Sequence, residues 1–89
     1  MKDLSQLKTR VVSSNIRKIR EYKNYTQEYL AAKLGISQNA YSKIELNYSK
    51  LTLERLFRIA DVLEVDIVQL LSERMDYIQK SSVASYSNS

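Results

Sequence analysis

The chain contains one glycine, Gly35, and no proline in its 89 residues. Glycine and proline are the strongest interrupters of regular structure, and apolar side chains recur here at spacings of three and four along most of the chain. These two features together favour an all-helical fold. A chain of this length has room for one small domain with a single core.

The composition excludes several classes of function. There is no cysteine and no histidine, which excludes disulfides, thiolate or imidazole metal sites and serine-histidine triads. A single glycine cannot build the glycine-rich loops that hold the phosphates of nucleotides. We therefore expect neither an enzyme nor a cofactor or metal.

No apolar run approaches the roughly 18 residues that would span a bilayer, and residues 1–20 lack the apolar core of a signal peptide. We expect a cytoplasmic protein without a membrane partner.

Charge is unevenly distributed along the chain. Residues 1–50 carry ten Lys or Arg against four Asp or Glu, whereas residues 51–89 carry four against six. The first part would attract a polyanion. Charge alone does not distinguish a polyanion-binding face from an uneven solvated surface.

Caps and periodicity predict five helices. The first begins near Asp3, where Gln6 would complete a capping box, and ends near Tyr22. A second begins after Thr26, a third runs from Gln38 to about Leu46, a fourth begins at Thr52, and a fifth begins after Asp66. We expect positive φ at Asn24, Gly35 and Asn47, and residues 64–66 form a short link.

The predicted core follows the apolar stripes of these helices. Its members are Leu4, Leu7, Val11, Val12, Ile16, Ile19, Tyr22, Tyr29, Leu30, Ala31, Leu34, Tyr41, Ile44, Leu53, Leu56, Phe57, Ile59, Ala60, Leu63, Ile67, Val68, Leu70 and Leu71.

The link between the second and third helices is too short for an antiparallel pair. Only Gly35 and Ile36 separate the helix ending at Leu34 from the cap at Ser37, so the two helices must cross steeply, as in a helix-turn-helix. Ala31 must then be small because the helices approach closely, and Gly35 must reverse the chain in a narrow corner.

At this point the chain resembles the Cro and lambda-repressor-like, or XRE-type, helix-turn-helix DNA-binding domains. The resemblance covers about Val12 to Leu71 and rests on IRKIREYKNYTQEYLAAKLGISQNAYSKIE followed by LTLERLFRIADVLEVDIVQLL. It implies a compact five-helix, lambda-repressor-like domain that binds double-stranded DNA and regulates transcription.

The resemblance also assigns roles to matching positions. The residues that would read bases in the major groove are Gln38, Asn39, Ser42 and Lys43. Those that would contact the DNA backbone are Arg17, Gln27, Ala40, Asn47, Tyr48 and Lys50. The residues with structural roles are Arg20, Ala31, Gly35 and Glu45, with Arg20 and Glu45 paired across helices.

The C-terminal part of the chain suggests a partner. Leu71, Met75 and Ile78 continue an apolar stripe, which we interpret as a homodimer contact for binding a two-fold symmetric operator as a repressor. The predicted organisation is residues 1–11 as an extension of the first helix, 12–71 as the DNA-binding domain, 72–80 as a helical extension and 81–89 as a disordered tail.

Two alternatives stay open on the sequence. The first is an antitoxin-type module that binds a protein partner through its C-terminal segment. The second is the controller protein of a restriction-modification system.

Overall fold

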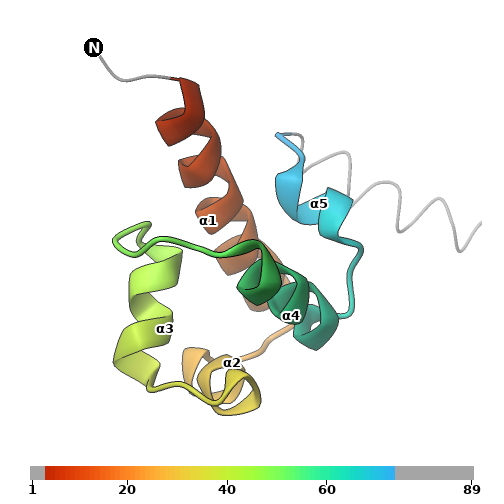
Figure 1. Ribbon diagram of the computed structural model, residues 1–89. Helices are drawn as coiled ribbons and strands as arrows, with labels where there is room; N and C mark the ends of the chain where they lie inside the picture. Colours follow the sequence, from red (N-terminus) through yellow and green to blue (C-terminus); the bar gives the residue numbers. More distant parts are fainter. Residues whose placement is uncertain (1–3, 74–89) are drawn as a thin grey trace, which may run out of the picture.

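Five helices and no strand make up the part of the chain that the structure, a computed structural model, describes, residues 4–73. This confirms the predicted all-α fold. The helices are α1 (Leu4–Tyr22), α2 (Gln27–Leu34), α3 (Gln38–Glu45), α4 (Leu53–Leu63) and α5 (Ile67–Leu71). In Figure 1, α2 and α3 lie together at the lower left, α1 runs past them, and α5 lies beside α1.

Several expectations fall outside the described residues. They are the capping box at Asp3, the dimer contacts Met75 and Ile78, and the partner-binding segment 72–89 apart from its first two residues. Within residues 4–73, no helix is long and apolar enough to cross a membrane.

Each of the four shorter helices begins at a side-chain cap that the sequence predicted. The hydroxyls of Thr26, Ser37 and Thr52 each accept a hydrogen bond from a main-chain N–H three residues on, at 3.0–3.1 Å. Asp66 caps α5 and shares a capping box with Gln69. These bonds satisfy first-turn N–H groups that no helical carbonyl can reach.

Four of the described residues adopt positive φ and end helices or turns. Gly35 (φ 71°), Asn24 (61°) and Asn47 (61°) were predicted, and Glu64 (60°) was not. Glu64 ends α4, and its side chain accepts a hydrogen bond from the Tyr25 hydroxyl at 3.0 Å. The link expected at residues 64–66 is therefore a left-handed cap followed by the start of α5.

Glycine is needed at position 35 because of the positive φ there, and not because a side chain would lack room. A Cβ built on Gly35 meets no atom within 4 Å. The predicted positive φ, which strains any residue with a Cβ, therefore explains Gly35. Its N–H and that of Ile36 donate to carbonyls of the last turn of α2, which a left-handed residue makes possible.

Within residues 4–73, the core contains twelve buried apolar residues drawn from all five helices. Among them, Ile16, Leu30, Tyr41, Ile59, Leu63 and Leu70 are the largest that are completely buried. Their stripes meet because each helix turns one face inward.

Eight residues predicted in the core are exposed instead. They are Leu4, Leu7, Tyr22, Tyr29, Leu53, Phe57, Val68 and Leu71. Spacing places a residue on a face, but it does not say how far a neighbouring helix extends to cover that face. The first turns of α1 rise above the rest of the bundle (Figure 1), so the described chain covers Leu4 and Leu7 only in part.

A buried asparagine ties α1 to the end of α5. The Asn15 amide donates to the main-chain carbonyls of Leu70, at 3.0 Å, and of Ser72. Carbonyls at a helix C-terminus have no helical partner, so Asn15 satisfies two of them and fixes where α5 stops.

Replacing Gly35 with Ala should lower the free energy of unfolding by about 1–2 kcal/mol, because an L-residue is strained at this φ although the site has room. Chemical denaturation measures the change. Gly35→Asn is the matched variant and should cost less, since asparagine tolerates this region best after glycine. Equal stability of Gly35→Ala and the wild type would contradict the assignment.

Candidate nucleic-acid interface

The third helix presents two different faces. Tyr41, Ile44 and Glu45 are buried, whereas Gln38, Asn39 and Lys43 are exposed and Ser42 is half-buried. The four polar residues predicted to read bases share one side because they are spaced by one and four positions. The structure therefore brings together the whole predicted base-reading set on the outer side of α3.

Glu45 is the centre of a polar network inside the bundle. The Arg20 guanidinium donates through Nε to Glu45 Oε2 at 2.6 Å and through Nη2 to Oε1 at 3.1 Å, so the predicted pair is present. The Tyr41 hydroxyl donates to Oε2, and the Gln27 amide donates from Nε2 to Oε1 at 3.0 Å. Arg20 also donates from Nη1 to the Tyr25 carbonyl at 2.8 Å.

The network fixes the protonation states of its members. Burial by itself raises the pKa of Glu45, but hydrogen bonds from Arg20, Tyr41 and Gln27 outweigh it and hold that pKa below its ordinary value. Burial and the hydrogen bond to Glu45 raise the pKa of the Tyr41 hydroxyl, so it remains a donor. The carboxylate is thus ionised and acts only as an acceptor.

A shallow hollow lies beside α3, between that helix, the following loop and the first turn of α4. Its lining includes three cations, Lys43, Lys50 and Arg55, and no carboxylate. Hydroxyl groups also line it, from Ser37, Ser49 and Thr52. Cations and hydroxyl groups that line one hollow, with no carboxylate in that lining, suit a phosphate group.

Other predicted backbone-contacting residues lie around this region. Tyr48 is 77% exposed in the loop after α3, and Ala40 lines the hollow. Asn47 is half-buried, and its side-chain carbonyl accepts from the Ser13 hydroxyl at 3.3 Å. Arg17 is exposed on α1, where it pairs with Glu21 at 3.3 Å.

Sequence reasoning missed two features of the site. Arg55 was counted with the acidic second part of the chain, yet folding places it beside Lys43 and Lys50. Its position three residues after the predicted cap Thr52 was the available signal, since it places the side chain in the first turn of α4. The hydrogen bond between Gln27 and Glu45 had no signal in the sequence.

The fold and this constellation define a helix-turn-helix protein: two short capped helices joined by a left-handed glycine, with the second offering a polar face beside a basic hollow. The match to the helix-turn-helix family covers residues 16–70. The chain belongs to this family, in its XRE type.

Two known proteins are similar to this chain. An uncharacterised HTH-type transcriptional regulator of Bacillus subtilis, YqaE, is 37% identical over 59 residues, which cover 66% of this chain and 51% of the relative. The matched region thus spans about half the length of that relative. The crystal structure of NHTF, a hypothetical transcription factor from Neisseria, superimposes with a TM-score of 0.72 at 27% identity, covering 83% of this chain and 86% of that one.

Acid should destabilise the protein through Glu45. Because its folded pKa lies below the unfolded value of about 4.3, the stabilisation is fully present above that pH and is lost as pH falls through the folded value. Glu45→Gln should be about 3–5 kcal/mol less stable at neutral pH, since Arg20 loses its buried partner. Its stability should fall less steeply than that of the wild type below pH about 5.

Thermal unfolding from pH 7 to pH 3 measures both effects. The matched control is Glu21→Gln, because Glu21 is an exposed carboxylate. It pairs with Arg17 at 3.3 Å and reaches Arg20 only at 3.9 Å, and such surface pairs contribute little. Parallel pH profiles for the wild type and Glu45→Gln would rule out the assigned role of this carboxylate.

Proposed function

We propose that the chain is a sequence-specific double-stranded DNA-binding transcriptional regulator that acts as a homodimer on a two-fold symmetric operator. The observation that carries the proposal is the exposed polar side of α3 beside a hollow with three cations and no acid. The names of the two similar proteins, a transcriptional regulator and a transcription factor, support the same function.

The residue types fit two separate roles on DNA, reading bases and contacting phosphates. Gln38 and Asn39 offer paired donor and acceptor atoms that match the N6 and N7 edge of adenine, and Lys43 suits guanine O6 and N7. Lys50 and Arg55 contact phosphates through the hollow, which sets the register of α3 without reading sequence. Gln27, Asn47, Tyr48 and Arg17 add backbone contacts at the margins of α3.

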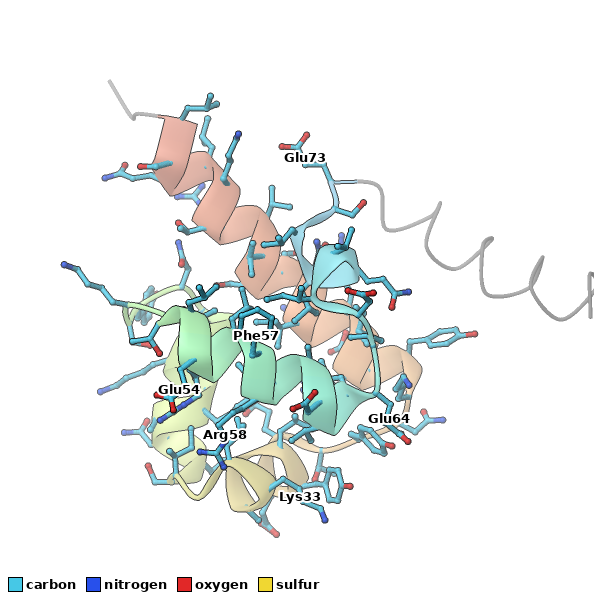
Figure 2. All side chains as sticks on the ribbon, turned by 45° about the vertical axis from the view of Figure 1, so that its right-hand side comes forward. Lys33, Glu54, Phe57, Arg58, Glu64 and Glu73 are labelled. Carbon is cyan, nitrogen blue, oxygen red and sulfur yellow. The ribbon has the colours of Figure 1, made fainter. Side chains whose placement is uncertain are left out.

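The dimer rests on exposed apolar side chains of α4 and α5. Leu53 and Phe57 are exposed on α4, and Val68 and Leu71 on α5; Figure 2 shows Phe57 on the outer side of α4 with Glu54 and Arg58 nearby. Apolar exposure shared by two packed helices is typical of a self-association surface. We propose that Leu71 contacts the partner and that Met75 and Ile78 extend the contact.

Two copies related by a two-fold axis would place their α3 helices in successive major grooves. Half-sites should lie about 34 Å apart, one turn of B-DNA. Selection of bound sequences from a random DNA pool should therefore enrich a palindrome with that spacing, and failure to enrich any sequence would count against the proposed function.

Replacing Gln38 with Ala should weaken binding to the selected site by about 1–3 kcal/mol and relax the preference at one base position. Binding to random DNA should change little, because the amide makes no phosphate contact in this arrangement. Titrations with both duplexes measure the difference. An equal loss on both would remove Gln38 from the base-reading set.

Replacing Lys50 or Arg55 with Ala should weaken binding to selected and random DNA alike and reduce the salt slope by about 1 for each phosphate that the protein no longer neutralises. The matched control is Lys18→Ala, an equal change of charge. Ser13 of α1 contacts the loop after α3 through Asn47. Lys18 is exposed and lies five residues after Ser13, which places it on the opposite side of α1, away from that loop. If Lys18→Ala reduces the salt slope as much as the Lys50 and Arg55 variants do, the residues of the hollow do not contact phosphates preferentially.

Replacing Leu71 with Asp should convert the dimer to a monomer in sedimentation equilibrium. Burying a leucine contributes about 1.5–3 kcal/mol, and two-fold symmetry counts the loss twice. Leu7→Asp is the control, because Leu7 is similarly exposed, at 45% against 51%, but lies on α1. A monomeric wild type, or an unchanged dimer in Leu71→Asp, would contradict the proposed interface.

A further inference from the structure

Gln27 is the first residue of α2 and is held by a residue of α3. Its Nε2 donates to Glu45 Oε1 at 3.0 Å, and its side chain is partly buried. The other Glu45 oxygen receives the Arg20 Nε and the Tyr41 hydroxyl. The network thus joins the start of α2 to the buried side of the helix that presents Gln38 and Asn39.

The charge of Glu45 sets the orientation of the Gln27 amide. An ionised carboxylate only accepts hydrogen bonds, so the NH2 group and not the carbonyl must face Glu45. One amide hydrogen is thereby used inside the protein. The second hydrogen and the carbonyl oxygen are left for another partner, with the carbonyl turned away from the carboxylate.

We propose that Glu45 is a positioning residue for DNA binding, because it orders the Gln27 amide before DNA arrives. The proposal rests on the proposed function and deepens it. Glutamine has one of the largest rotamer entropies among side chains, and fixing it on binding weakens affinity. With Glu45 in place this entropy is lost on folding, and the second amide hydrogen is available to a phosphate at the start of α2.

The same carboxylate therefore has two separable tasks. Its pair with Arg20 holds α1 against α3, and its bond with Gln27 prepares the interface. A merely structural residue would affect stability alone. A positioning residue must also affect affinity, and only while Gln27 is present.

The test is a double-mutant cycle on the selected duplex with the full-length chain. Glu45→Asp keeps the negative charge near Arg20 but withdraws the oxygens by one methylene from all their partners, so the Gln27→Ala background is needed to isolate the part that depends on Gln27. Affinity should fall roughly three- to tenfold in Glu45→Asp, which corresponds to one immobilised side chain. In the Gln27→Ala background the same change should alter affinity less than twofold.

Tyr41→Phe is the matched control. It removes another hydrogen bond to Glu45, on the oxygen that Gln27 does not contact. Its unfolding midpoint should fall, and the affinity of the folded protein should stay within twofold of the wild type. An equal loss for Glu45→Asp in both backgrounds would overturn the proposal, as would no loss in either.

A measurement on the wild type without DNA keeps the test decisive if Glu45→Asp does not fold. Side-chain amide relaxation by NMR should show the Gln27 NH2 group restricted and that of exposed Gln38 mobile. Equal mobility of the two groups would overturn the proposal. If the wild type selects no DNA sequence while Gln27 is restricted, the proposed function fails and the ordering of Gln27 by Glu45 stands.

Discussion

The ion pair between Arg20 and Glu45 is the interaction on which the arrangement of the first three helices depends. Arg20 comes from α1 and Glu45 from α3. Glu45 also accepts a hydrogen bond from Gln27 of α2, and Arg20 also donates one to the carbonyl of Tyr25. Taking both charges out of water is costly, so the pair is stable only because its buried nitrogen and oxygen atoms have hydrogen-bond partners. Its directional bonds fix the relative positions of α1, α2 and α3. Apolar packing alone would define these positions less specifically.

The polar surface of α3 follows from that fixed arrangement. Tyr41, Ile44 and Glu45 turn inward, and the helix can then offer only its opposite side. The loop after Asn47 and the cap at Thr52 bring Lys50 and Arg55 beside Lys43. Polar atoms that match base edges and cations that match phosphates thus lie on adjoining parts of one surface.

Sequence patterns were most reliable where the cause is local. The caps at Thr26, Ser37, Thr52 and Asp66 and the left-handed Gly35 depend on side-chain reach and backbone sterics within a few residues. The core was less predictable. Leu7 and Phe57 have suitable spacing, but they are exposed because their described neighbours cover them only in part. Glu64 was missed as a cap because glutamate has no intrinsic preference for positive φ, and its position there depends on the turn into α5.

Five helices, the caps that begin α2 to α5, the turn at Gly35 and the side of α3 that carries Gln38 could be predicted from the sequence, because each depends on interactions over a few positions of the chain. The family resemblance added the pair of Arg20 and Glu45. The place of Arg55 in the basic hollow and the hydrogen bond from the Gln27 amide to Glu45 were seen only in the folded chain. Both depend on contacts between residues that are distant in the chain, and such contacts are set by how the helices pack.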